Sequence, residues 1–234
     1  TSVPQTATYT FTATGNGCTP AVSSTVVTVN PTPVLTNLPA ATTICSSDQL
    51  NFTPTSDVTG TTFTWTSAIS ANITGNTVGS GDIRDALINT GNAIETVTYT
   101  VTATGPGPEL CVNAVTQDYV VTVNPPVTQT ITNNDGVVCE GIATNIAYTT
   151  PTAGGTISVQ ASYPAGVSGS VDYTVLTVLG ASGTITESLS NNNSTSQIVT
   201  YTFTATGNGC TPAGRSTVVT VNQTPGLPHL PAAT

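Results

Sequence analysis

Positive charge is almost missing from this sequence: lysine is absent, and Arg84 and Arg215 are the only basic residues apart from one histidine. Proteins that bind nucleic acids neutralise phosphates with clustered basic side chains, so nucleic-acid binding is not expected. A chain without lysine also cannot form the lysine–asparagine isopeptide bond that braces many adhesin domains. With 11 acidic residues the formal net charge is −9, and the surface must therefore consist mainly of neutral polar groups.

The features that mark membrane spans, metal sites and enzymes are scarce as well. No run approaches 18 apolar residues, so no membrane span is expected, and any export signal should lie outside this window because residues 1–10 lack its charged and apolar regions. The single histidine, His229, has no cysteine or histidine at ligand spacing and is interpreted as an exposed linker residue. No nucleophile elbow or phosphate-binding loop occurs. We therefore expect no enzymatic activity, no bound cofactor and no bound metal ion.

Threonine dominates what is present, at about a fifth of the chain. Its branched Cβ favours the pleated sheet, and its hydroxyl keeps an outward face wet. Threonine alternates with apolar residues in segments such as VTYTVTAT (97–104) and STVVTVN (24–30). This period of two predicts strands, and the Gly-, Pro- and Asn-rich turns between them predict antiparallel two-sheet sandwiches.

An internal repeat sets the domain organisation. Residues 1–42 align with residues 193–234 at 31 of 42 positions, a shift of 192 residues. A weaker copy of the same segment begins at Tyr99, so one period holds two units of about 95 residues. Proline connectors divide the chain into the C-terminal part of a repeat (1–30), two complete repeats (31–124 and 125–222) and the start of another (223–234).

The alternation also predicts the core of the first complete repeat. We expect its core to contain Leu50, Phe52, Phe63, Trp65, Leu87, Val97, Tyr99, Val101, Val121 and Val123. Tyr201 is the equivalent of Tyr99 in the second repeat. Val159 stands where Trp65 stands, so the second core should be smaller or should borrow Tyr148 and Tyr163 to fill the space.

The order of motifs resembles a known family. An ICS or VCEG segment, a run IxxxLxN, a strand VTYTxTAT, a glycine-rich turn, a cysteine and VxVNP recur along the chain. They are similar to the PKD-like and immunoglobulin-like tandem repeats of giant Bacteroidota cell-surface adhesins. The resemblance implies an all-β fold of tandem β-sandwiches, export by the type 9 secretion system and a role like that of gliding-motility adhesins.

The five cysteines fit an oxidising, exported setting. Each complete repeat has one early and one late cysteine, which favours disulfides between Cys45 and Cys111 and between Cys139 and Cys210, with Cys18 left over. Each bond would stabilise its repeat by roughly 4 kcal/mol, less any strain. A rival pairing, Cys18 with Cys45 and Cys111 with Cys139, would join neighbouring repeats, and spacing does not exclude it.

One acidic turn is a candidate calcium site. GSGDIRD (79–85) brings Asp82 and Asp85 close together, but the second repeat has only Glu187 at the matching place, and the ligand pattern of an EF-hand is missing. We interpret this segment as a solvated turn.

Together these observations predict a non-catalytic, extracellular segment of a long surface adhesin or filament, acting as a rigid stalk. Its expected partners are neighbouring repeats of the same chain, and its weakly charged strand edges could support self-association into filaments. Two alternatives stay open: a module that binds a glycan or protein ligand, and accessory domains of a large secreted enzyme.

Overall fold

The computed structural model describes residues 2–107, 111 and 116–224. These residues form strands and connecting loops only, and no helix among them is long and apolar enough to cross a membrane. The chain divides into two compact units. Unit 1 comprises Thr1–Thr90 and Ile94–Val123, and unit 2 comprises Gly91–Ala93 and Asn124–Thr234. The predicted start of a further repeat, with His229, lies almost entirely outside the described residues.

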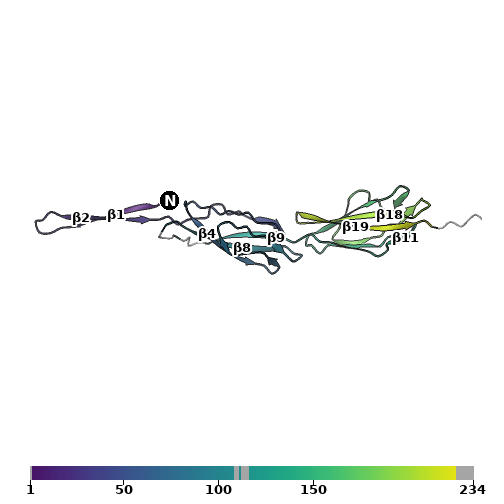
Figure 1. Cartoon of the computed structure of the whole chain (residues 1–234), viewed down its shortest axis with the longest axis horizontal. Helices are drawn as coiled ribbons and strands as arrows, with labels where there is room; N and C mark the ends of the chain where they lie inside the picture. Colours follow the sequence, from purple (N-terminus) through teal and green to yellow (C-terminus); the bar gives the residue numbers. More distant parts are fainter. Residues whose placement is uncertain (1, 108–110, 112–115, 225–234) are drawn as a thin grey trace, which may run out of the picture. The chain divides into compact units, whose positions relative to one another are not determined.

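Unit 1 contains a separate hairpin and a sandwich (Figure 1). Its strands are β1 (Gln5–Ala13), β2 (Ala21–Val29), β3 (Thr42–Cys45), β4 (Thr62–Ile69), β5 (Ile73–Thr74), β6 (Gly79–Ser80), β7 (Ile88–Asn89), β8 (Glu95–Thr104) and β9 (Gln117–Asn124). Strands β1 and β2 pair only with each other among the described strands, whereas β3-β9-β8-β4-β6 form a five-stranded sheet. Strands β5 and β7 and the bridge between Phe52 and Ile83 belong to the segments that complete the sandwich.

Unit 2 repeats this plan, and several of its short strands are longer than those of unit 1. Its strands are β10 (Thr130–Asn133), β11 (Val137–Cys139), β12 (Ile146–Thr149), β13 (Thr156–Ser162), β14 (Val167–Gly169), β15 (Thr177–Gly180), β16 (Ser182–Ile185), β17 (Leu189–Asn191), β18 (Gln197–Gly207) and β19 (Cys210–Asn222). The main sheet has the order β11-β19-β18-β13-β15, and a second sheet has the order β10-β12-β16. Strands β14 and β17 form a further pair.

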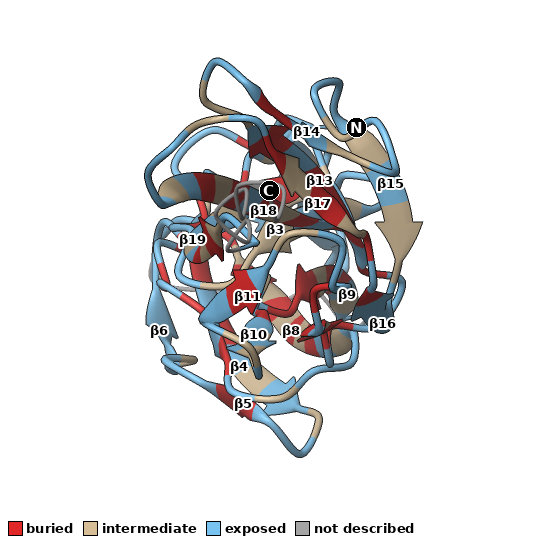
Figure 2. Ribbon diagram, turned by 90° about the vertical axis from the view of Figure 1, so that its right-hand side faces the viewer, coloured by how far each residue is buried: buried red, intermediate tan, exposed pale blue. Residues whose placement is uncertain are grey.

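Threonine and apolar residues alternate across the two faces of each main sheet, as the period of two requires. In β8 the buried positions are Val97, Tyr99, Val101 and Ala103, and the intervening residues are less buried. Buried residues are red in Figure 2. All ten residues predicted for the core of the first complete repeat belong to one buried cluster. The all-β, tandem-sandwich fold is therefore the fold of the described chain.

In unit 2 one strand pair departs from the otherwise antiparallel arrangement. Strand β11, at the beginning of unit 2, runs parallel to β19 at its end, with Val138 opposite Val221. Backbone hydrogen bonds from Thr220 to Gly136 and from Glu140 to Asn222, both 2.9 Å, flank this pair. The first and last strands of the main sheet are thus joined side by side in the same direction.

The two cores place their large aromatic residue on different strands of the same cross-strand pair. Trp65 on β4 lies opposite Val101 on β8, whereas Val159 on β13 lies opposite Phe203 on β18. An aromatic residue on one strand and valine on the other fill the layer in both units. Phe203 therefore compensates for the smaller Val159, and this partner was missed by the sequence prediction.

The predicted substitutes for the tryptophan contribute less directly. Tyr148 is buried and packs on Phe203 with ring centroids 6.3 Å apart. Tyr163 is only partly buried against the core. Tyr148 thus helps to fill the second core, while Tyr163 lies at its margin.

Candidate functional site

The motif IxxxLxN turns out to carry a buried acid at its third position in both units. Every second residue of Ile83–Asn89 is almost fully covered, with exposed fractions of 0% for Ile83, 8% for Asp85, 0% for Leu87 and 1% for Asn89. The matching residues Ile185, Glu187, Leu189 and Asn191 are at most 1% exposed. The motif in this chain is therefore Ile-x-acid-x-Leu-x-Asn, with one face turned to the core.

In unit 1 the acid is Asp85, and three donors satisfy its carboxylate. The Thr77 backbone N–H donates to Oδ2 at 2.7 Å and the Thr77 hydroxyl donates to Oδ1 at 2.8 Å. The Tyr99 hydroxyl donates to Oδ2 at 2.7 Å. Burial, and next the hydrogen bond to Asp85, raise the pKa of Tyr99 far above its ordinary value, so this phenol stays protonated.

In unit 2 the acid is Glu187, and two tyrosines hold it. The Tyr201 hydroxyl donates to Oε1, and the Tyr163 hydroxyl lies 3.1 Å from Oε1 and 3.0 Å from Oε2. Burial raises the pKa of Glu187 above its ordinary value, while hydrogen bonds from Tyr201, Tyr163 and the Val171 backbone oppose this rise. The carboxyl group thus sits in a site that disfavours its charge.

Gly169 makes room for this carboxyl group. A Cβ atom at position 169 would lie 2.0 Å from Glu187 Oε2 and 3.0 Å from the Tyr163 hydroxyl. Real Cβ atoms do not approach other atoms so closely, so any side chain here would displace the acid. The close approach explains why the short strand β14 ends on a glycine.

The final asparagine of the motif ties it to the last strand of each main sheet. The Asn89 amide donates to the Val123 carbonyl at 3.0 Å. The Asn191 amide donates to the Val221 carbonyl at 2.9 Å and to the Thr195 carbonyl at 3.0 Å. A buried amide that links two elements in this way fixes their register.

The acidic turn divides into an exposed and a buried part. Asp82 forms an ion pair with Arg84 at 2.8 Å, and both side chains are more than two-fifths exposed. The hydrogen bond from Arg84 keeps the pKa of Asp82 below its usual range. The prediction of a solvated turn is correct for Asp82 and wrong for Asp85, because the alternation turns position 85 inward. No group of three His, Cys, Asp or Glu residues that could hold a metal occurs in the described part of the chain.

Trp65, Tyr99 and Tyr201, the predicted core aromatics, are all buried, with exposed fractions of 6%, 0% and 0%. The rings of Trp65 and Tyr99 meet edge to face with centroids 5.6 Å apart. Gly79 on the neighbouring strand β6 leaves space for the indole, because a Cβ there would lie 3.0 Å from it. The single tryptophan is therefore a packing residue.

The cysteines do not lie where within-repeat disulfides could form. Cys139 is exposed, carries no disulfide and pairs with Asn222 at one end of β19, while Cys210 begins that strand twelve residues earlier. Twelve residues of extended strand span about 40 Å, whereas a disulfide needs Cα atoms within about 7 Å of each other. The predicted pairing of Cys139 with Cys210 does not fit this structure.

The same geometry separates the two cysteines of unit 1. Ser46, next to Cys45, bonds to Asn89, whose side chain reaches Val123. Val123 pairs with Glu95 at the start of β8, whereas the Cys111 carbonyl accepts a hydrogen bond from Gly105, just past the end of β8. About ten strand residues, or roughly 33 Å, lie between these ends, so Cys45 and Cys111 are not bonding partners here.

Disulfide bonding nevertheless occurs in the chain. Cys45 and Cys210 each carry a disulfide bond. Cys18 and Cys139 are exposed thiols.

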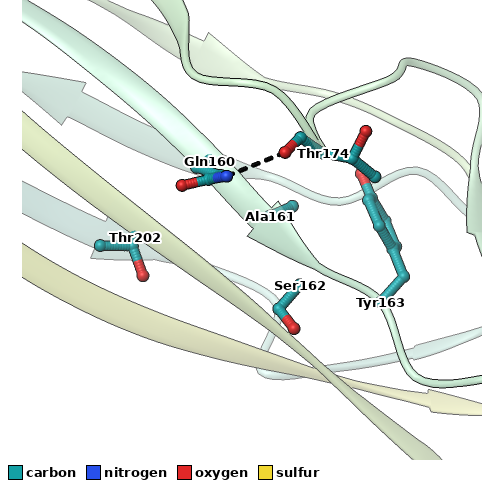
Figure 3. Close-up of a pocket in the computed structure, with 6 residues that line it drawn as sticks. All are labelled: Gln160, Ala161, Ser162, Tyr163, Thr174 and Thr202. Carbon is teal, nitrogen blue, oxygen red and sulfur yellow. Dashed lines mark hydrogen bonds between the residues drawn. The ribbon is translucent and has the colours of Figure 1, made fainter.

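A shallow hollow of about 470 Å³ lies on the outer face of unit 2. Its lining residues are Gln160, Ala161, Ser162, Tyr163, Thr174 and Thr202. In Figure 3 Gln160 reaches across to the Thr174 carbonyl, at 2.9 Å. The lining offers hydroxyl and amide groups without charge, and its one aromatic residue, Tyr163, is already held by Glu187. This arrangement can hydrogen-bond a polar molecule but holds no acid–base pair for catalysis.

Comparisons with known proteins agree with the domain type. The family model of the PKD-like domain matches residues 42–127, the segment that contains β3 to β9. A comparison with curated protein sequences finds no match.

Solved structures of tandem cadherin domains are similar to the chain. Protocadherin Gamma B2 extracellular cadherin domains 3–6 align over 95% of this chain and 59% of their own, with 12% identity and a TM-score of 0.44. The protocadherin gammaB7 EC3–6 cis-dimer structure aligns over 94% and 60%, with 14% identity and a TM-score of 0.41. Mouse clustered PcdhgC3 EC1–3 aligns over 95% and 77%, with 10% identity and a TM-score of 0.42. The chain spans about three fifths of the length of the first two structures.

Proposed function

We propose that this chain is a non-catalytic structural segment of a long extracellular surface adhesin, in which each sandwich is a rigid spacer that carries tension. The source in a Bacteroidota adhesin of the gliding-motility type belongs to the same proposal. It rests on the order of motifs along the chain and on the match of residues 42–127 to the PKD-like family.

The observation that carries the proposal is the parallel pair of β11 and β19, the first and last strands of the main sheet in unit 2. Tension on the two ends of this unit would pull β11 and β19 in opposite directions along their own axes. The hydrogen bonds from Thr220 to Gly136 and from Glu140 to Asn222 would then be loaded together, in shear. A set of bonds that must break together resists force better than bonds that open one by one. Such a pair suits a domain that transmits load.

The buried acids support a structural role in another way. Asp85 and Glu187 occupy the same place in the two repeats, and their partners are core tyrosines and a threonine. Ionisable groups in catalytic sites face a substrate cleft, whereas these two acids are at most 8% exposed. These two buried carboxyl groups therefore serve the packing of each repeat.

The disulfide-bonded Cys45 and Cys210 support an extracellular location, because disulfides persist in oxidising compartments. A surface of neutral threonine faces suits a segment that must stay soluble outside the cell. We assign the segment to the cell surface on these grounds.

The experiment that tests a spacer role is replacement of one repeat in the surface protein that carries it. Residues 31–124 are exchanged for an unrelated β-sandwich of equal length, and in a second strain they are deleted. If the repeat is a spacer, the exchange should preserve adhesion of the cells, whereas the deletion should shorten the distance that the protein extends from the cell surface. Loss of adhesion after the exchange, with surface display unchanged, would instead show that this repeat binds the ligand.

A further inference from the structure

The hairpin of β1 and β2 presents an uncovered apolar face. Nine residue pairs join the strands, from Gln5 with Val29 to Ala13 with Ala21. Every residue of both strands is exposed except Ala7, which is half-buried. Exposed fractions reach 55% for Tyr9 and 62% for Phe11. Apolar side chains in such a row on one face of a sheet are rarely left to solvent.

A second hairpin in this chain shows how the same face looks when it is covered. Adding 192 to each residue number turns the pairing of β1 with β2 into the pairing of β18 with β19, from Gln197 with Val221 to Ala205 with Ala213. Residues 8–21 are identical to residues 200–213. The two hairpins are therefore copies of each other in both sequence and register.

The copies differ in burial. In unit 2 the inward positions Val199, Tyr201, Phe203, Ala205, Val219 and Val221 are all 0% exposed. Their equivalents in the first hairpin are Ala7, Tyr9, Phe11, Ala13, Val27 and Val29. In unit 2 the segment 125–192 provides the cover, and its strand β13 also pairs with the free edge of β18 over seven residues. The structure thus contains an example of the partner that fits the uncovered hairpin.

The tyrosine adds a chemical requirement to this fit. Tyr99 donates to Asp85 and Tyr201 donates to Glu187, and in each case the acid lies 14 residues earlier in the chain. Tyr9 occupies the same place in its hairpin, and residues 1–30 contain no aspartate or glutamate. A hydroxyl that becomes buried needs an acceptor. A second copy of the hairpin could cover the face but could not supply the carboxylate.

We propose that the uncovered face of the β1–β2 hairpin is a docking surface for an open sandwich half of the same repeat type, of which residues 125–192 are the example. The partner is a segment that directly precedes the hairpin in the chain. It pairs a strand with the free edge of β1 and brings a carboxylate to the Tyr9 hydroxyl. This inference concerns domain completion and stands independently of the load-bearing role proposed above.

The test fuses a copy of residues 125–192 directly before Thr1 of the full chain and measures amide hydrogen exchange by mass spectrometry. Residues 8–21 and 200–213 are identical, so the peptides compared must include Thr6 and Ala7, which are Ile198 and Val199 in the second copy, or Val22 and Ser23, which are Gly214 and Arg215. We expect exchange in β1 and β2 to slow by at least about 100-fold on fusion, with β18 and β19 protected in both chains. In the original chain β18 and β19 serve as the internal reference for a closed sandwich.

Two variants of the fused chain locate the contact. Phe11→Ala should greatly reduce the new protection in the fused chain and leave exchange in the unfused chain unchanged. Changing the glutamate of the fused copy that corresponds to Glu187 to alanine should weaken protection of β1 while the reference hairpin keeps its own. Rapid exchange of β1 and β2 in the fused chain would overturn the proposal. So would dimers of the unfused chain, detected by sedimentation, in which β1 and β2 are already protected from exchange.

Discussion

Changing Glu187 to glutamine should alter how the stability of unit 2 depends on pH. The carboxyl group is 0% exposed, and burial raises its pKa above the ordinary value near 4.5. Glutamine keeps a carbonyl acceptor for the hydroxyls of Tyr201 and Tyr163 and carries no charge at any pH. The variant therefore removes the titration while it retains much of the packing.

The sign follows from proton binding in the two states. Below about pH 4.5 both the folded and the unfolded chain hold the proton, and the contribution of the carboxyl group to stability is fully present. As the pH rises, the unfolded chain releases its proton first, so the free energy of unfolding falls until the pH passes the folded pKa. A difference of one proton corresponds to a slope of at most about 1.4 kcal/mol per pH unit. Glu187→Gln should lack this slope and gain stability relative to the original chain as the pH rises.

Urea unfolding at a series of pH values, followed by far-UV circular dichroism in reducing agent, measures this effect. Fluorescence of the single tryptophan, Trp65, follows unit 1 separately. Asp172→Asn is the matched control, because Asp172 is exposed and its hydrogen bonds with Thr174 lower its pKa; its titration therefore lies below this window. Equal pH slopes for unit 2 in the original chain and in Glu187→Gln would refute the reasoning.

Three further predictions concern packing and thiols. Gly169→Ala should destabilise unit 2 by about 1–3 kcal/mol in urea unfolding, because its Cβ would lie 2.0 Å from Glu187 Oε2; Gly136→Ala, with no atom within 4 Å of its Cβ, should change stability by less than about 0.5 kcal/mol, and equal effects would contradict the assignment. Phe203→Ala should cost about 3–5 kcal/mol, whereas Phe11→Ala at the equivalent but exposed position should be nearly neutral in the original chain; a large loss at Phe11 would show that the hairpin is already covered. Iodoacetamide should modify Cys18 and Cys139 without denaturant or reductant, and recovery of a peptide linking Cys139 to Cys210 would disprove the strand geometry described for unit 2.

Much of the fold follows from sequence patterns alone. Alternation of threonine with apolar residues determines which side of a strand faces inward, and the repeated segments align the two sandwiches. The same rule predicts burial at positions 83, 85, 87 and 89. The missing EF-hand pattern argues against calcium but does not decide exposure, and the interpretation of Asp85 as part of a solvated turn is wrong. The period-two pattern was the better guide, since Tyr99 provides a hydroxyl for the buried carboxylate.

Other features of the fold depend on how the strands pair, which the sequence of a single strand does not contain. The exchange of the aromatic position between Trp65 with Val101 and Val159 with Phe203 is visible only when the cross-strand register is known. The cysteines show the same limit. Their spacing along the chain favours one disulfide within each repeat. The topology, however, places the two cysteines of each predicted pair at opposite ends of a long strand, β8 in unit 1 and β19 in unit 2.

Pulling the two ends of the chain with a force probe, in reducing agent so that disulfides do not shorten the released length, tests the load-bearing claim most directly. We expect two discrete unfolding events, each releasing on the order of 300 Å of chain. Glu140→Pro removes the hydrogen bond from Glu140 to Asn222 beside the parallel pair and should lower the force of one event only. Gradual extension without discrete events, or an unchanged force in the proline variant, would contradict a role in carrying tension.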